Sequence, residues 1–335
     1  MTYLVSLIND HIFPAYLFIK EMEGKYDRLL LVASHRSAVQ VSRIEKTLRL
    51  AEGSAPQIVI SETDLNDIRD ELNNHRFFPE DRFIVHLSYD TTVMSIGIFE
   101  YFSNHGNASF YFVPPGKNSI EEIRTSHKRP LQYRVNVWEY FSLHGVRIKP
   151  NEKLTYPVKH TFELYEQFKM AGYNKDRLEM MRFFDEMDEV NKIYYSGAWF
   201  EEYVYHRIKK EKKLADDCIY TGVKIFRSET DMENDNEIDI VFVLDNELYV
   251  GECKTSLSGI PGGKSGSKLL EDYLYKLAAV TIDFGMNVRQ LFFTLHQLKR
   301  LNLDSIRRRM KILQLEVLIG RDDFKKERLP LDFQK

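Results

Sequence analysis

Three acidic side chains and a lysine have types and spacings that favour metal-dependent chemistry. Residues 237–254 contain two β-branched and aromatic runs joined by Asp245 and Asn246, a pattern typical of a hairpin with a two-residue loop. Counting outward from that loop places Asp239 directly opposite Glu252. Directly opposed Cβ atoms lie about 4.5–5.5 Å apart, so two carboxylates there repel each other unless a cation lies between them.

On the same face of the hairpin, Glu237 falls opposite Lys254. A divalent cation with hard oxygen ligands would relieve the repulsion between Asp239 and Glu252, leaving Lys254 to act on the chemistry. The structural alternative is a surface corner where Lys254 pairs with Glu237, a contact that contributes little stability.

A further carboxylate comes from the helix predicted upstream of the hairpin. On a helical wheel Glu201 falls at the edge of the buried arc, whereas Glu202 points away from it. Glu201 is therefore expected to complete the metal shell or to hold a second ion. Carboxylates that hold Mg²⁺ or Mn²⁺, with a lysine that orients water or neutralises a phosphate, suit phosphodiester hydrolysis. The candidate catalytic residues are Glu201, Asp239, Glu252 and Lys254.

Length and composition indicate a two-domain globular protein. The chain has 335 residues, 43% of them hydrophobic and 29% charged, and two cysteines, which rule out a disulfide scaffold and favour a reducing compartment. The apolar patch 4–8 is too short for a signal or a membrane span, so we expect a cytoplasmic protein without a membrane partner. The net charge of −3 confines any nucleic-acid contact to the basic segments 206–213 and 299–311, whose alternative interpretation is a solvated helix face.

Short apolar runs alternate with amphipathic segments over the first 115 residues or so, which predicts a parallel sheet with helices on both faces. The expected strands are 3–8, 28–33, 57–60, 82–87 and 109–113, and the expected helices are 13–23, 37–51, 64–75 and 92–103. Ligands of such sheets bind beyond the carboxyl ends of the strands. Polar residues follow three of these strands at 9–11, 34–37 and 88–92, although helix capping alone also explains them. The chain has no dinucleotide-binding or Walker glycine motif.

The remaining chain is expected to form a connector, a second domain and a tail. The predicted domains are 1–150, a helical connector 151–189, a mixed α/β domain 190–320 and a charged, loosely held tail 321–335. A short strand at 132–137 is expected to complete the first domain. After the hairpin, helices are expected at 269–284 and 304–311, and strands at 290–295 and 315–319.

The second domain resembles the PD-(D/E)xK restriction-endonuclease fold. The resemblance rests on Gly197 to Glu201 in the helix, on Asp239 after an acidic turn, and on Glu252-Cys253-Lys254. The leading proline of the motif is replaced by Ile238, which leaves the metal ligand intact. The resemblance implies a metal site made of Glu201, Asp239, Glu252 and Cys253, although Cys253 fits a core position better than a catalytic one.

The two-domain plan is similar to that of CRISPR ancillary nucleases of the Card/Can type, in which a CARF sensor precedes such a nuclease. The resemblance implies a Rossmann-like CARF domain that dimerises and binds cyclic oligoadenylate. A Thr-Gly-Gly-Thr-Lys type loop of such families matches residues 88–94, where Thr91 and Met94 keep the pattern. The implied ligand residues are Asn9, Asp10, His11, Ser34, His35, Tyr89, Thr91 and Thr92.

The resemblance further implies a homodimer activated by cyclic tetra-adenylate that cuts single-stranded DNA and RNA with Mn²⁺ or Mg²⁺. Two alternatives stay open. A stand-alone repair or restriction endonuclease would cut without a small activator, and a non-catalytic regulator would use the acidic corner for structure alone.

Overall fold

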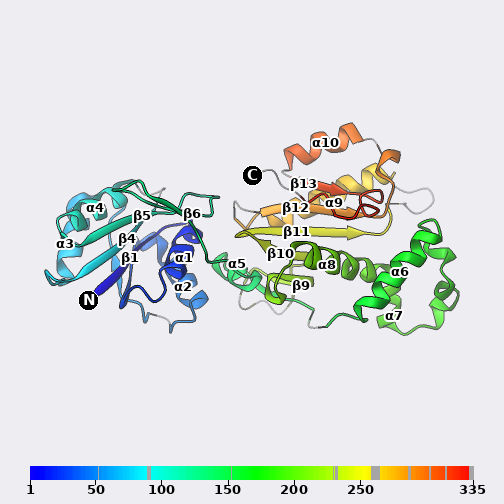
Figure 1. The fold of residues 1–335 in the computed structure, drawn as a ribbon, viewed down its shortest axis with the longest axis horizontal. Coiled ribbons are helices and arrows are strands. Elements are labelled where there is room, and N and C mark those ends of the chain that lie inside the picture. Colours follow the sequence, from blue (N-terminus) through cyan, green and yellow to red (C-terminus); the bar gives the residue numbers. More distant parts are fainter. Residues whose placement is uncertain are drawn as a thin grey trace. The chain divides into compact units, whose positions relative to one another are not determined.

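The computed structural model describes residues 1–331 with the exception of 52, 89–91, 152, 229, 231–232, 258–264, 286–287, 302 and 314. The chain divides into two compact units (Figure 1). The first unit comprises Met1–Val135 and Glu139–Gly145, and the second comprises Asn136–Trp138 and Val146–Lys335. No helix in the described part of the chain is long and apolar enough to cross a membrane.

The first unit is built on a seven-stranded sheet in the order β3-β2-β1-β4-β5-β6-β7. Its strands are β1 (Thr2–Ile8), β2 (Arg28–Ala33), β3 (Gln57–Val59), β4 (Arg82–Leu87), β5 (Ala108–Phe112), β6 (Ser119–Glu122) and β7 (Lys128–Pro130). Strands β1 to β5 are parallel, whereas β6 and β7 pair antiparallel. The helices are α1 (Ile12–Glu21), α2 (Ala38–Thr47), α3 (Leu65–Asn74), α4 (Thr92–Ser103) and α5 (Val137–Leu143). This arrangement confirms the predicted Rossmann-like parallel sheet.

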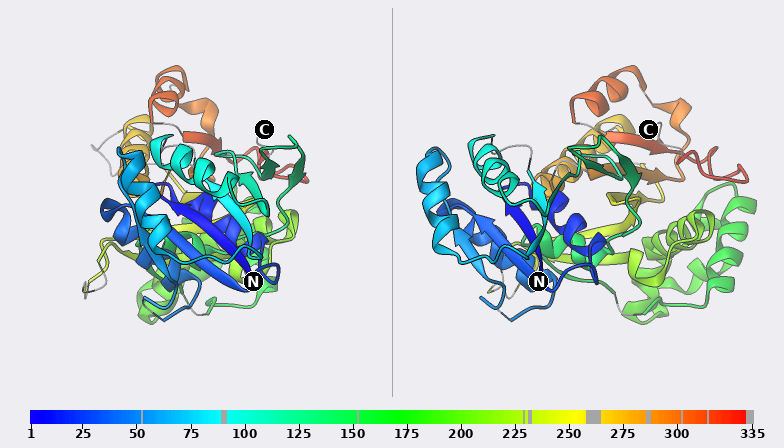
Figure 2. Two further views of the ribbon diagram at one scale, coloured as in Figure 1. Left: turned by 90° about the vertical axis from the view of Figure 1, so that its left-hand side faces the viewer. Right: turned by 60° about the vertical axis from the view of Figure 1, so that its left-hand side comes forward.

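Helices cover both faces of this sheet, which explains why its central strands are mostly apolar on both sides. On one face Val5 and Leu7 of β1 share a buried cluster with Ile68 of α3 and Ile98 of α4. On the other face the ring of Phe18 in α1 stacks on a histidine of β4, with 5.0 Å between the ring centroids. Figure 2 shows these helices on either side of the strands.

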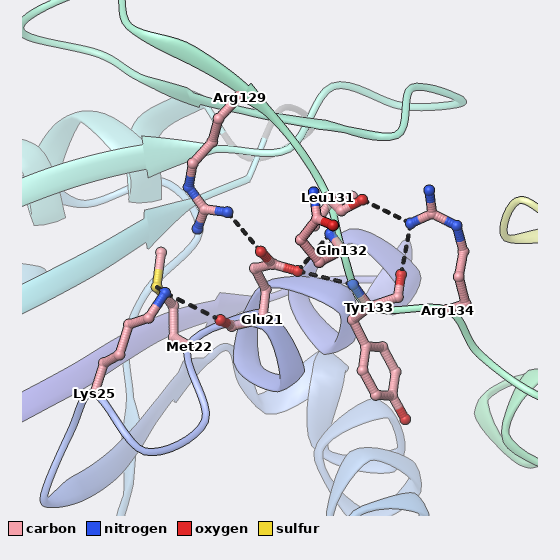
Figure 3. A network of polar contacts seen from close by, with 8 residues as sticks. All are labelled: Glu21, Met22, Lys25, Arg129, Leu131, Gln132, Tyr133 and Arg134. Atoms are coloured by element: carbon pink, nitrogen blue, oxygen red, sulfur yellow. Dashed lines mark hydrogen bonds and ion pairs between the residues drawn. The ribbon is translucent and has the colours of Figure 1, made fainter.

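The strand predicted at 132–137 is wrong, and a single carboxylate is the physical reason. Glu21, at the C-terminal end of α1, accepts the backbone N–H groups of Gln132 and Tyr133 at 2.9 Å each and pairs with Arg129 (Figure 3). A backbone N–H that donates to a side chain cannot also pair with a neighbouring strand. Residues 131–136 are therefore not part of a strand, and α5 begins at Val137.

The second unit is built on a six-stranded mixed sheet in the order β13-β12-β11-β10-β9-β8. Its strands are β8 (Arg147–Lys149), β9 (Ile219–Phe226), β10 (Asn236–Leu244), β11 (Glu247–Lys254), β12 (Val288–Thr294) and β13 (Leu315–Ile319). Its longer helices are α6 (Val158–Met170), α8 (Trp199–Lys212), α9 (Gly266–Thr281) and α10 (Leu303–Ile312), and α7 (Glu189–Ile193) is short. Strands β8 and β9 were not predicted from the sequence.

The sheet of the second unit is buried on both faces by helices. The aromatic side of α8, with Phe200 and Tyr203, shares a core cluster with Ile240 and Phe242 of β10 and with Phe293 of β12. On the opposite face, α9 contacts β11 and β12. The charged end of the β10–β11 hairpin therefore lies at the border of a thick apolar core.

Residues 321–331 are not loosely held, in contrast to the prediction for 321–335, whose last four residues lie outside the described part of the chain. Phe324, Leu329 and Leu331 are 2%, 3% and 1% exposed and belong to the core cluster under α8. The side chain of Arg207 in α8 donates to the carbonyl oxygens of Phe324, Lys326 and Glu327 at 3.3–3.5 Å. The many charges of this segment therefore surround three apolar anchors.

Candidate active site and candidate ligand-binding edge

The hairpin adopts the register predicted from its turn. Asp245 and Asn246 have φ values of 52° and 63°, as a two-residue loop of type I′ requires, and Leu244 pairs with Glu247. Paired residues continue as far as Ile240 and Gly251, so the next position along places Asp239 opposite Glu252. The predicted register is confirmed over these pairs, and the predicted positions of Asp239 opposite Glu252 and of Glu237 opposite Lys254 lie beyond the last of them.

The sheet is distorted on the other side of Asp239, where β9 runs alongside β10. Gly222 lies at the position that would face Asp239, and its φ of +58° is a left-handed conformation that favours glycine. A Cβ atom there would lie 2.0 Å from the Asn151 side-chain nitrogen. The Thr221 hydroxyl donates to the Asp239 carbonyl at 2.8 Å. Asp239 is thus not among the residue pairs that β10 forms with β9 or with β11. Such a break in pairing is usual where a strand turns one side chain in a new direction.

The carboxylates of the hairpin converge on the ammonium of Lys254. Its Nζ lies 3.0 Å from Asp239 Oδ2 and 2.6 Å from Glu252 Oε1. Burial lowers the pKa of Lys254, but the two carboxylates outweigh it and raise that pKa above its ordinary value. Burial and the Asp239 charge raise the pKa of Glu252, although Lys254 opposes them. The corner is therefore a buried acidic pair that one internal cation neutralises in part.

Glu201 of α8 contributes to the same electrostatic site. Burial, followed by repulsion from Asp239, raises the pKa of Glu201 to about 9. Glu202 does not point away from the protein, contrary to the helical-wheel expectation. It is 4% exposed and accepts the Thr155 N–H at 2.6 Å and the Thr161 hydroxyl at 3.5 Å. The expectation failed because α6 covers the side of α8 that the wheel assigned to solvent.

The acidic corner has the donor chemistry of a hard divalent cation, because its carboxylate oxygens are the ligands that Mg²⁺ and Mn²⁺ prefer. Over the described residues, however, no three Asp, Glu, His or Cys side chains converge closely enough to hold an ion. The Lys254 ammonium lies between two of the candidate ligands instead. The Cys253 thiol lies in the core cluster under α8, where burial raises its pKa, and its role as a metal ligand stays a prediction.

Each basic segment has some cations at the surface, including Lys210 and Lys213 in segment 206–213, and others that pair within the fold. In segment 206–213, Arg207 is 12% exposed, pairs with Glu211 at 2.7 Å and holds the C-terminal chain. It serves the fold and is not part of an open basic face. In segment 299–311, Arg307, Arg308 and Lys311 are exposed, so this segment keeps cations at the surface.

The sensor residues lie where the carboxyl ends of parallel strands meet, at one edge of the first sheet. Asn9, after β1, donates to the Ser88 hydroxyl after β4, and its oxygen accepts the His11 N–H at 3.0 Å. Ser34, after β2, donates to Glu62 at 2.7 Å. The structure thus brings together loops that are far apart in the sequence.

Other predicted sensor residues at this edge face the solvent or fall outside the description. Asp10, His11 and His35 are exposed, and Thr92 is exposed at the start of α4. Tyr89 and Thr91 lie outside the described residues.

Several residues around the two sites were missed by the sequence reasoning. At the sensor edge, Gln40 donates to Asp10 at 3.0 Å and Arg36 lies 3.9 Å from it, so α2 also contributes to this edge. Arg36 directly follows His35, and its charge beside two polar loops was a usable signal for an anionic ligand. At the acidic corner, the ring of Tyr273 in α9 faces Lys254, and nothing in the local pattern of α9 indicates this.

Two family models match the chain, one for each unit. Residues 3–140 match the Card1 CARF domain and residues 188–328 match the Card1-like endonuclease domain. The chain belongs to the Card1 family. Its first unit is a CARF domain and its second is an endonuclease domain of that family. No curated protein matches the chain.

Solved structures share the fold of this Card1-family chain at low sequence identity. Protein VC1899 from Vibrio cholerae matches with a TM-score of 0.70 and 17% identity, covering 97% of this chain and 95% of its own. Can2 from Sulfobacillus thermosulfidooxidans, solved with cyclic tetra-adenylate, matches with a TM-score of 0.65 and 16% identity, covering 96% of each chain. A type III CRISPR defence DNA nuclease activated by cyclic oligoadenylate gives 0.60 and 16%, covering 88% of this chain and 45% of its own.

Proposed function

We propose that this protein is a metal-dependent nuclease of type III CRISPR defence that cuts single-stranded DNA or RNA when cyclic tetra-adenylate binds its CARF domain. The observation that carries the proposal is the corner of Asp239, Glu252 and Lys254, within a matched endonuclease domain and at the end of a hairpin of fixed register. A homodimer in the cytoplasm is part of the same proposal.

The acidic residues have distinct roles in the proposed reaction. Asp239, Glu252 and Glu201 would hold Mn²⁺ or Mg²⁺, whose Lewis acidity activates water and offsets negative charge on the phosphate. Because its pKa is raised, the Glu201 carboxyl is protonated at neutral pH in the metal-free protein. A metal ion held there would lower that pKa again, so Glu201 would serve as an ionised ligand.

Lys254 has two roles in turn. Without a metal ion its ammonium neutralises Asp239 and Glu252, which otherwise repel each other. If those carboxylates held an ion, the ammonium would be available to stabilise charge developing on the phosphate. The exposed cations Arg307, Arg308 and Lys311 suit contact with the nucleic-acid backbone, which is recognised through its phosphates.

The sensor edge supports activation by an anionic ring nucleotide. The solvent-exposed side chains there are hydrogen-bonding groups and a cation, including His11, His35, Arg36 and Thr92, and such groups suit phosphates and ribose hydroxyls. The α4 helix begins at this edge, and the N–H groups of a helix N-terminus favour negative charge. The fold shared with cyclic tetra-adenylate-bound Can2 supports the same ligand.

The test is cleavage of labelled single-stranded DNA and RNA with and without cyclic tetra-adenylate, in Mn²⁺, in Mg²⁺ and in a chelator. We expect cleavage only with both activator and metal, and a loss of at least about a hundredfold in the Glu252→Gln variant. Glu237→Gln is the matched control, because Glu237 is an exposed carboxylate of the same hairpin. Equal cleavage without the activator would support a stand-alone nuclease, and full activity of Glu252→Gln would contradict the site.

A further inference from the structure

The Lys254 ammonium has a partner on a different element from the carboxylates. Its Nζ lies 5.2 Å from the centroid of the Tyr273 ring, on α9. Among the described residues, its ion pairs and hydrogen bonds come from the hairpin itself: Asp239 and Glu252, together with the Cys253 carbonyl oxygen at 3.0 Å. An ammonium within about 6 Å of an aromatic ring centroid is attracted by the ring's negative face.

The Tyr273 ring is held in place by its surroundings. It lies against the Phe292 ring of β12, with 6.0 Å between the centroids. On α9 its neighbours Leu270, Leu274 and Leu277 are buried, which fixes the helix on the sheet. A ring held from the sheet and from its own helix offers the ammonium a fixed position, which a flexible surface side chain would not.

We propose that Tyr273 is a positioning residue that holds the Lys254 ammonium at the reaction centre once Asp239 and Glu252 have bound the metal ion. This inference rests on the proposed function. In the metal-free state the ammonium shares its charge among two carboxylates, a carbonyl and the ring. In the metal-bound state the carboxylates are engaged, so the ring and the Cys253 carbonyl hold the ammonium.

With an ion on the carboxylates, repulsion from that ion and the loss of two anionic partners would bring the ammonium closer to the ring, so the ring contact would stabilise the metal-bound state more than the metal-free state. Loss of the ring therefore has two effects. The released lysine becomes less well positioned, which lowers the rate of the chemical step. The lysine also returns more readily to the carboxylates, which weakens metal binding.

The test compares Tyr273→Leu with Tyr273→Phe, which keeps the ring face. For Tyr273→Leu we expect kcat to fall about fivefold to thirtyfold, the KM for single-stranded substrate to stay within about twofold, and Mn²⁺ affinity to fall by a similar factor. Calorimetry without nucleic acid measures that affinity independently of activity. Tyr273→Phe is expected to match wild type in all three quantities.

Tyr275→Leu is the control for damage to α9. Tyr275 lies two positions along the same helix, is 45% exposed, and has its own cation over the ring, with Arg309 at 5.6 Å. Its loss is expected to leave kcat and Mn²⁺ affinity unchanged. In a Lys254→Met background, Tyr273→Leu is expected to change Mn²⁺ affinity no further, because no ammonium is left to hold.

The outcomes separate this inference from the function on which it rests. If the wild type cleaves with metal and Tyr273→Leu has the same kcat and Mn²⁺ affinity, the positioning role is wrong while the proposed function stands. A fall that is equally large in the Lys254→Met background also overturns it, because the ring then acts on something else. A wild type without metal-dependent cleavage overturns both.

Discussion

Asp239 accepts the backbone N–H of Cys253 through its side chain, with 2.7 Å between Oδ2 and the nitrogen. The side chain of Asp239 in β10 thus forms a hydrogen bond to the backbone of β11 just beyond the last residue pair of the hairpin. Asp239 therefore has a structural function in addition to the proposed metal ligation.

This contact predicts different results for two substitutions at Asp239. Asp239→Ala leaves the Cys253 N–H without its acceptor, and we expect a loss of about 1–3 kcal/mol in the free energy of unfolding. Asp239→Asn keeps an acceptor oxygen and is expected to lose much less stability, although it too loses nuclease activity. Urea unfolding of both variants measures the difference, and equal losses of stability would contradict the structural role.

The raised pKa of Glu201 predicts a pH dependence of stability in the metal-free protein. Its pKa is 4.5 when unperturbed and about 9 in the folded state, so the folded protein binds this proton more tightly than the unfolded chain does. The resulting stabilisation is complete below about pH 4.5 and is lost as the pH rises toward 9.

Melting temperatures between pH 5 and 9 measure this effect, which we expect to be on the order of 1–2 kcal/mol. Glu201→Gln should flatten the profile and stabilise the metal-free protein at the alkaline end. Glu163→Gln is the control, because Glu163 is a helical carboxylate with 56% of its side chain exposed. A profile that Glu201→Gln leaves unchanged would show that another group titrates.

The Glu21 contacts predict the opposite pH dependence. Burial favours the neutral carboxyl, but the hydrogen bonds from Arg129 and from the N–H groups of Tyr133 and Gln132 outweigh it and lower the pKa. Its stabilising contribution is present above its ordinary pKa of 4.5 and is lost as the pH falls through the lowered value. We expect Glu21→Gln to cost about 1–3 kcal/mol at neutral pH.

Chemical unfolding of the whole chain at pH 7 and at low pH tests the Glu21 prediction. Glu23→Gln is the matched control, because Glu23 is 66% exposed, follows α1, and pairs with Lys20 only three residues earlier. If both variants lose the same stability, Glu21 contributes no more than a surface ion pair does.

Arg36 predicts an electrostatic contribution to activator binding. Its side chain is 74% exposed at the sensor edge, next to the exposed His35. We expect Arg36→Ala to weaken cyclic tetra-adenylate binding about fivefold to fiftyfold, with a reduced dependence on salt. Arg69→Ala serves as the control, because Arg69 is an exposed arginine of α3 paired with Glu100. Calorimetric titration in low and moderate salt measures both, and equal affinities would remove Arg36 from the ligand site.

The parts of the structure that follow from local patterns were predictable from the sequence. The hairpin register followed from two turn residues and the alternation beside them, and it placed Asp239 and Glu252 together. The parallel sheet of the first unit followed from alternating strands and helices, and its polar loops do meet at one edge.

The parts that the sequence did not reveal depend on contacts between distant residues. From the sequence alone, Gly222 would be expected only to weaken a strand. The structure shows that the Asn151 side chain occupies the space that a Cβ atom at this position would need. Phe324 lies in a charged stretch, and its burial depends on a surface of α8 more than a hundred residues earlier. Tyr273 is one aromatic residue of an amphipathic helix, and only the packing of α9 on the sheet brings it to Lys254.

The Glu21 contacts also bear on the order in which the first unit folds. Glu21 and Gln132 are 111 residues apart in the sequence, and the strands from β2 to β7 lie between them. Contacts across so long a loop carry a large closure entropy and form after the local ones. Residues 131–133 therefore become ordered only when the sheet is complete. During synthesis the endonuclease domain is therefore made after residues 131–133, and these residues are the last of the CARF domain to become ordered.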